Sequence, residues 1–316
     1  MPSRSISRRH FMATAAVSVA TQSMTNRNTA AASANTALRL GGPIFAKSDD
    51  PAVMAQAHRD LGYRAAYAPT VELEDRDRIR EIVSEYSAKD VVIAEVGAWV
   101  NMVDRDPVKR KKNITYVTQR LALAEELGAR CCVDIAGSFN PDAWDGPDPD
   151  NFGPEFFAAT VEVVRQVIDD VQPKRTRFAI EMMGWTLPSS PDEYLELIKA
   201  VDRRSFAVHM DACNLINSPY RIYDNASVIE EAFKKLGPWV ASCHAKDVAW
   251  VPGSQVHFKE VIPGTGVLDY ATYLRELARL PADVPLMLEH LGSAEEYQQG
   301  SDYIKSVAQG EGLSFG

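Results

Sequence analysis

Short apolar runs alternate with longer amphipathic stretches from Leu38 to the end of the chain. The short runs predict buried β-strands, and the stretches with apolar residues at helical spacing predict α-helices. Strands alternating with helices predict a parallel sheet, and eight such units predict closure into a single (β/α)8 TIM barrel of the α/β class. The predicted strands are 38–41, 64–68, 91–96, 131–135, 177–182, 206–211, 240–244 and 285–289.

Glycines mark where several helices should end. Gly62, Gly128 and Gly237 each follow a leucine just before a predicted strand, which fits a left-handed helix cap. A doubly wound open sheet would need a glycine-rich phosphate loop after the first strand, and Gly41-Gly42-Pro43 does not provide one. Since no linker divides residues 35–316, we expect one domain there.

The N-terminal residues 1–34 resemble a twin-arginine export signal. The segment Ser7-Arg8-Arg9-His10-Phe11-Met12 is followed by a mildly apolar run and then by small residues that suit cleavage. This order predicts an exported protein, periplasmic or extracellular, while a basic tail that contains Arg-Arg by chance is the alternative. The four cysteines match no zinc or disulfide spacing and are expected to be buried as small apolar residues: Cys131, Cys132, Cys213 and Cys243.

Composition narrows the partners to small molecules. The chain is 46% hydrophobic and 24% charged, as is typical of a globular domain, and its net charge of -9 disfavours nucleic acid as a partner. No apolar run reaches the length of a membrane span, so no membrane contact is expected after signal removal. The oligomeric state stays open, and a homo-oligomer is compatible with the sequence.

Four consecutive predicted strands each end at an ionisable residue, and together they predict a metal site. These residues are Glu181, Asp211, His244 and Glu289. Active-site residues of TIM barrels lie at the C-terminal ends of strands, so the four should meet at one mouth. Three carboxylates there would repel each other unless a cation neutralised them. Oxygen ligands with one imidazole suit one divalent ion such as Mn²⁺, Mg²⁺, Co²⁺ or Zn²⁺.

The order Glu, Asp, His, Glu on the last four strands resembles the xylose-isomerase-like TIM-barrel family of sugar isomerases and epimerases. The segments His244-Ala245-Lys246-Asp247-Val248 and Pro263-Gly264-Thr265-Gly266-Val267-Leu268-Asp269-Tyr270 are similar to two further segments of that family. The resemblance implies a carbohydrate substrate and an enediolate intermediate. It also implies that Glu181 removes a proton beside a carbonyl and that Glu289 returns it on the opposite face, with the metal as Lewis acid.

Five further residues are candidates for substrate binding, and one of them departs from the family pattern. Ketose epimerases of the family carry a histidine three residues after the metal aspartate, where this chain has Asn214. His209 is expected to be a buried histidine behind the ligands, and His290 is expected to point towards the helices. The substrate-binding candidates are Glu95, Trp185, Asn214, Lys246 and His257.

Three alternative functions bear on the same constellation. With a 3-keto glycoside as substrate, the same proton abstraction would lead to β-elimination, and the protein would be a lyase. A non-catalytic exported sugar-binding barrel is the second alternative, although binding alone does not require both Glu181 and Glu289. A metal nuclease is disfavoured, because the barrel is acidic and offers few histidines for a multi-zinc cluster.

Overall fold

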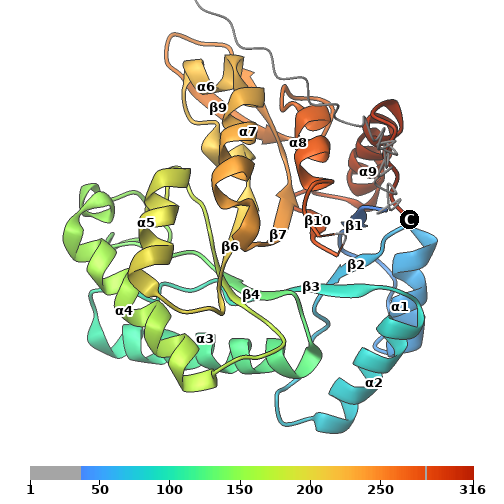
Figure 1. The fold of residues 1–316 in the computed structure, drawn as a ribbon, viewed down its shortest axis with the longest axis horizontal. Helices are drawn as coiled ribbons and strands as arrows, with labels where there is room; N and C mark the ends of the chain where they lie inside the picture. Colours follow the sequence, from blue (N-terminus) through green and yellow to red (C-terminus); the bar gives the residue numbers. More distant parts are fainter. Residues whose placement is uncertain (1–36, 282) are drawn as a thin grey trace, which may run out of the picture. The chain divides into compact units, whose positions relative to one another are not determined.

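The computed structural model describes residues 37–281 and 283–316. Figure 1 shows their strands with helices packed around the outside. Eight parallel strands form a closed barrel in which each strand pairs with its neighbours in the chain and the first pairs with the last, which confirms the predicted TIM barrel. The barrel strands are β1 (Arg39–Gly41), β2 (Ala65–Tyr67), β3 (Val92–Gly97), β4 (Cys131–Asp134), β5 (Phe178–Glu181), β6 (Phe206–Asp211), β7 (Val240–Ala245) and β10 (Pro285–Leu288).

Helices connect these strands on the outer face of the barrel. They are α1 (Pro51–Asp60), α2 (Arg76–Ala88), α3 (Pro107–Leu127), α4 (Pro154–Val171), α5 (Pro191–Val201), α6 (Pro219–Tyr223), α7 (Asn225–Leu236), α8 (Tyr270–Leu277) and α9 (Ala294–Gly310). Short 3₁₀ turns occupy Pro149–Phe152, Cys213–Leu215 and Gly237–Trp239. None of the described helices has the length and apolar character that a membrane span requires.

The sequence signals for helix ends hold at most positions. Asp50 caps α1, since its carboxylate accepts hydrogen bonds from the backbone N–H groups of Ala52 and Val53. The predicted left-handed caps are present at Gly62 and Gly128, with φ of 71° and 65°. The prediction for Gly237 is wrong, because its φ of -45° continues the helical backbone into a 3₁₀ turn before β7.

An antiparallel hairpin after β7 was not expected. Its strands β8 (Asp247–Val251) and β9 (His257–Val261) pair along their whole length and leave the barrel between β7 and α8. The prediction treated this stretch as a loop. Both strands of the hairpin are partly exposed, unlike the fully buried strands of the barrel beside them.

Strand register determines which side chains meet at the barrel mouth. Glu181 is paired with His209 across β5 and β6, and Asp211 is paired with His244 across β6 and β7. Below this level the barrel interior is filled by small buried residues, namely Cys131, Val133, Ala179, Ala207 and Ala241. These residues form one apolar layer in the barrel interior.

Two further sequence predictions concern the cysteines and the N-terminal segment. All four cysteines are buried and free, as expected. The predicted signal segment, residues 1–34, lies outside the described residues, so export stays a prediction.

Candidate metal centre and substrate cavity

The four predicted ligands converge at the C-terminal end of the barrel. Glu181 and Asp211 are the last residues of β5 and β6, His244 lies near the end of β7, and Glu289 directly follows β10. One donor atom from each lies within 4.8 Å of the others. Nδ1 of His244 lies 2.8 Å from Oε1 of Glu289 and 3.3 Å from Oε1 of Glu181. The structure thus brings together all four predicted ligands.

The ammonium group of Lys246 shares these carboxylates. Its Nζ lies 2.5 Å from Oε1 of Glu289, 2.8 Å from Oδ2 of Asp211 and 3.5 Å from Oε1 of Glu181. Burial opposes ionisation of Asp211, but Lys246 and His244 outweigh it and hold the pKa of that carboxyl well below its usual range. Burial would lower the pKa of Lys246, yet Asp211, Glu181 and Glu289 raise it overall. The cluster is therefore a charged network even in the interior.

The donor set fits a divalent cation. Oδ2 of Asp211 and Oε1 of Glu289 are buried and lack a hydrogen bond of good geometry, although Lys246 is close to both. Buried carboxylate oxygens without hydrogen bonds require a strong positive partner, which a metal ion supplies. Glu181, Asp211, His244 and Glu289 are the residues that would hold it. Lys246 would then have to move aside, since a divalent cation repels its ammonium.

Glu95 lies beneath this cluster and orients His244. Its Oε2 lies 3.2 Å from Nε2 of His244, and its Oε1 lies 2.9 Å from Nε2 of His209 and accepts a hydrogen bond from Ser242. A proton on Nε2 of His244 would be shared with Glu95, which leaves the Nδ1 lone pair facing the carboxylates. His209 is fully buried behind the ligands, as expected.

Asn214, predicted to contact substrate, instead supports two ligands. Its Nδ2 donates hydrogen bonds to Oε1 of Glu181 and to the carbonyl of Met182, each at 3.0 Å. Its backbone N–H donates to Oδ1 of Asp211 at 3.1 Å. An asparagine at this position therefore ties the ends of β5 and β6 together without adding charge.

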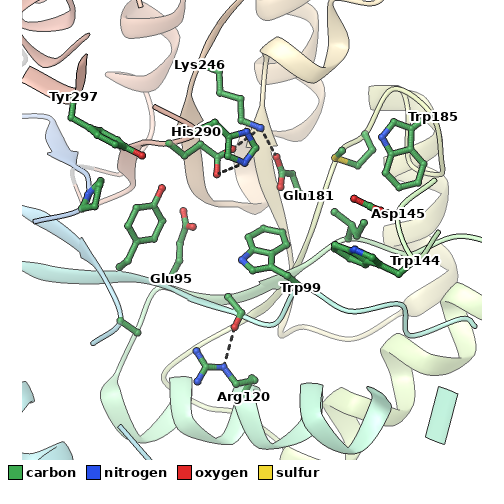
Figure 2. Close-up of a pocket in the computed structure, with 17 residues that line it drawn as sticks. Glu95, Trp99, Arg120, Trp144, Asp145, Glu181, Trp185, Lys246, His290 and Tyr297 are labelled. Carbon is green, nitrogen blue, oxygen red and sulfur yellow. Dashed lines mark hydrogen bonds and ion pairs between the residues drawn. The ribbon is translucent and has the colours of Figure 1, made fainter. Parts of the chain in front are cut away.

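A cavity of about 630 Å³ opens above the ligands. Figure 2 shows Lys246, His290 and Glu181 beside it, with tryptophans along one side and Tyr297 on the other. Of the predicted substrate-binding residues, Glu95, Trp185 and Lys246 line this cavity, whereas Asn214 does not. Lining residues that the sequence analysis did not select include Tyr67, Trp99, Arg120, Trp144, Asp145 and Tyr297.

Two histidines differ from their expected places. His257 is exposed at the start of β9, where it pairs with Val251, and it does not line the cavity. The prediction that His290 points towards the helices is wrong, because its φ of 58° breaks the strand alternation after β10. His290 lines the cavity, with Nδ1 2.9 Å from Oε2 of Glu260, and this contact raises the pKa of its imidazole.

One curated protein matches part of the chain. The chain is 28% identical over 152 residues to a probable endonuclease 4 of Persephonella marina, a match that covers 46% of the chain and 50% of that protein. The chain thus spans about half the length of this curated relative.

Solved structures share the fold over nearly the whole barrel. One is a xylose isomerase-like TIM barrel protein of Mycobacterium smegmatis in complex with magnesium, with 20% identity, a TM-score of 0.60 and coverage of 82% of this chain and 88% of that one. Another is D-psicose 3-epimerase of Clostridium cellulolyticum H10 with D-tagatose, with 15% identity, a TM-score of 0.60 and coverage of 85% and 99%. At such identities the likeness establishes the fold alone.

A family model provides the assignment that these pairwise matches cannot. It is described as a xylose isomerase-like TIM barrel, and it matches residues 53–307, which contain all four candidate ligands. Because the match covers most of the chain and agrees with the closed eight-stranded barrel, this protein belongs to the xylose isomerase-like TIM barrel family.

Proposed function

We propose that the protein is a divalent-metal-dependent isomerase or epimerase acting on a carbohydrate. One observation carries the proposal. Of the four candidate ligands, Glu181 and Glu289 also line the cavity, whereas Asp211 and His244 do not. Two carboxylates that face bound substrate from separate strands are what proton removal and return at one carbon require.

The residues divide the work as follows. Glu181 removes the proton from a carbon next to a carbonyl, and Glu289 delivers a proton to that carbon from its own side. The bound divalent ion supplies Lewis-acid polarisation of the carbonyl. Lys246 lines the cavity near Glu289 and donates hydrogen bonds to substrate oxygens. Asn214 holds Glu181 in place from behind.

Solvent deuterium exchange tests the proton abstraction. The protein loaded with Mn²⁺ is incubated in D₂O with ketohexoses and with 3-keto glycosides, and NMR follows deuterium at the carbon beside the carbonyl. We expect exchange in the unchanged protein, and we expect the exchange rate to fall by roughly 10²–10⁴-fold in E181Q and in E289Q. E196Q on the exposed face of α5 is the matched control. Absence of exchange with every carbonyl sugar would favour a non-catalytic sugar-binding barrel.

Elemental analysis tests the metal independently of turnover. We expect about one equivalent of divalent metal per chain, because the donor set is that of a single ion. D211A should lose it, and D211N, which preserves shape, should bind it more weakly. A metal content that is the same in all three proteins would refute the assigned ligands.

Elimination from a 3-keto glycoside is the second candidate reaction. His290 lines the cavity beside Glu289, with 3.7 Å between its Nε2 and Oε2 of Glu289, and its raised pKa suits a proton donor to a departing alkoxide. The same NMR experiment separates the reactions, since elimination yields an unsaturated ketone and a free alcohol.

We also propose export through the twin-arginine pathway, which the arginine pair at Arg8 and Arg9 supports. A fusion of residues 1–40 to a reporter should reach the periplasm, and the substitution of both arginines by lysine should retain it in the cytoplasm. Periplasmic delivery that is indifferent to this substitution would contradict the proposal.

A further inference from the structure

Three tryptophans gather on one side of the cavity (Figure 2). Trp99, Trp144 and Trp185 all line it, and each belongs to a different loop, after β3, β4 and β5 respectively. The loops that follow barrel strands build the binding surface in this fold. The side of the cavity formed by these three loops is therefore aromatic, whereas the side near Glu289 is charged.

Two of the three tryptophans are more exposed than is usual for this residue, whereas Trp185 is half-buried. Trp99 and Trp144 are 41% and 42% exposed. Exposed aromatic surface that is concentrated inside a concave site marks a place where a ligand binds. A flat indole presents its face to rings with an apolar face, such as a sugar ring or an aromatic group.

The three loops are fixed to one another by buried polar side chains. Nδ2 of Asn101, on the Trp99 loop, donates to the carbonyl of Ser138 at 2.6 Å, and its Oδ1 accepts from the backbone N–H of Ser138 at 3.2 Å. Ser138 begins the segment that carries Trp144. These paired bonds hold the first two loops in register.

The third loop is tied in the same manner. Thr186, next to Trp185, donates to the carbonyl of Gly137 at 3.1 Å. Asn151 accepts a hydrogen bond from the backbone N–H of Phe139 at 2.8 Å, and its Nδ2 lies 3.5 Å from the carbonyl of Trp185. Since Asn101, Ser138, Asn151 and Thr186 are all buried, the loops that carry the three tryptophans of this aromatic wall are fixed relative to one another before a ligand binds.

The wall adjoins the candidate metal centre. The ring centroids of Trp99 and His244 lie 6.5 Å apart, so Trp99 lies beside the ligand cluster. Trp144 and Trp185 extend the surface away from the carboxylates. A cavity of about 630 Å³ lies well within the range of sites that take ligands larger than a single sugar ring.

We propose that the substrate is a glycoside whose first ring reacts at Glu181 and Glu289 while its second ring stacks on Trp99, Trp144 and Trp185. The placement of the first ring rests on the function proposed above. The second ring is either another sugar or an aromatic aglycone, because both offer a flat apolar face. Asp145, exposed beside Trp144 and lining the cavity, accepts hydrogen bonds from hydroxyl groups of a sugar in this subsite.

Calorimetric titration of the full chain with unreactive glycosides tests the subsite. The probes are methyl β-D-glucopyranoside with one ring, and methyl β-cellobioside and 4-nitrophenyl β-D-glucopyranoside with two. We expect at least one two-ring probe to bind about tenfold or more tightly than the one-ring probe. W144A and W185A should each weaken two-ring binding by roughly 5- to 10-fold and leave one-ring binding unchanged.

Two further variants test whether the effect depends on the position of a tryptophan in the cavity. A methyl group added at Gly97 would overlap Nε1 of Trp99, so G97A displaces that indole without removing it and should weaken the same probes. W250F alters a tryptophan that packs against Phe258 in the hairpin, away from the cavity, and should bind all probes as the unchanged protein does. Melting temperatures confirm that each variant is folded.

The outcomes separate this inference from the function on which it rests. Preference for the cellobioside identifies a sugar as the second ring, and preference for the nitrophenyl glucoside identifies an aromatic aglycone. Equal affinities for one-ring and two-ring probes, or tryptophan variants that weaken the one-ring probe as much, would overturn the subsite. If metal is missing but two-ring binding still depends on the tryptophans, the subsite stands and the isomerase proposal fails.

Discussion

His244 has a different partner on each ring nitrogen, and this arrangement explains why a carboxylate is buried beneath the ligand cluster. Glu95 is 1% exposed and lies 3.2 Å from Nε2, while Nδ1 faces Glu181 and Glu289. A carboxylate bonded to the far nitrogen fixes both the tautomer and the ring orientation of a ligating histidine. Glu95 therefore positions His244, one of the four candidate ligands, in addition to lining the cavity.

We predict that E95Q weakens metal binding by about 10- to 100-fold, the usual cost of losing such a partner. Competition with a chelating dye measures the affinity for Mn²⁺ or Zn²⁺. S242A is the matched control, because it removes the hydroxyl group that donates to Glu95 and leaves the contact with His244 intact. An unchanged metal affinity in folded E95Q would show that Glu95 does not position the ligand.

At the scale of residues, the place of a side chain could be predicted from the sequence where the residue lies at the end of a strand. Glu181, Asp211, His244 and Glu289 were predictable because an apolar run stopping at one charged residue fixes both register and direction. Trp99 and Trp144 were not predictable, since they lie on loops that carry no periodic signal. His290 was misplaced because alternation no longer applies once the backbone adopts a positive φ.

Among the elements, the loop before α8 depends on a single buried carboxylate. Asp247 accepts hydrogen bonds from the backbone N–H groups of Gly264, Gly266 and Leu268 at 2.9, 3.0 and 2.9 Å. Lys246, the preceding residue, contacts Asp211 in the ligand cluster, so the loop held by Asp247 is linked to that cluster through one residue of the backbone. An anion that satisfies several N–H groups is costly to replace.

We predict that D247N destabilises the protein by roughly 3 kcal/mol, because the amide that replaces one oxygen turns N–H donors towards other donors. Urea unfolding measures the change. D269N is the control from the same loop, since Asp269 caps α8 through Thr272 at 2.8 Å and an amide oxygen can still accept this hydrogen bond, so the substitution should cost less than about 0.5 kcal/mol. Equal costs for the two variants would contradict the special role of Asp247.

A buried histidine between α1 and α2 makes the stability of the folded protein depend on pH. His58 is buried against Tyr86, with 5.7 Å between ring centroids, and its Nδ1 has no hydrogen-bond partner. Burial lowers the pKa of His58 from 6.5 to about 4. Below pH 6.5 the unfolded chain therefore binds a proton at His58 that the folded protein does not, so stability falls as pH falls towards 4.

We predict that protonation of His58 in the unfolded chain lowers the free energy of unfolding by about 2 kcal/mol when the pH falls from 7 to 5. One unit of pKa difference corresponds to about 1.4 kcal/mol. Urea unfolding at both pH values, in the same metal buffer, should show H58L losing less stability than the unchanged protein by this amount. H257Q, which alters the exposed histidine of β9, should show no such difference. Parallel pH dependence in H58L and the unchanged protein would refute the prediction.

At the scale of elements, the eight barrel strands were predicted to within one or two residues at each end. Buried parallel strands are short continuous apolar runs, and proline and glycine mark the helices between them. The hairpin of β8 and β9 was missed because β8 follows β7 after one residue and β9 is mostly exposed, so no separate apolar run marks it. Gly237 was misjudged because proline at 238 continues the helical turn.

For the molecule as a whole, acidity bears on the choice between sugar and nucleic acid. The net charge is -9, and residues 1–34 contain four arginines and no acidic residue, so the barrel is more acidic than the full chain. Proteins that bind DNA gain most of their affinity from lysine and arginine at phosphates. The endonuclease relative shares only about half its length with this chain, which leaves the nucleic-acid question to experiment.

We predict that the metal-loaded protein neither binds nor cleaves duplex DNA that contains an abasic-site analogue. Fluorescence anisotropy should give a Kd weaker than about 10⁻⁴ M even at low salt, because an acidic barrel repels the phosphates around any cavity it presents. Gel analysis with Mn²⁺ and with Zn²⁺ checks for strand cleavage. DNA binding that weakens steeply with added salt would contradict this prediction. So would strand cleavage that is lost in E289Q, which would assign the same carboxylates to phosphodiester hydrolysis instead of proton transfer at carbon. The aromatic wall makes this outcome the less expected one, since it offers ring faces to a substrate, and the arginine and lysine side chains that line the cavity, Arg120 and Lys246, already contact a backbone carbonyl and the ligand carboxylates.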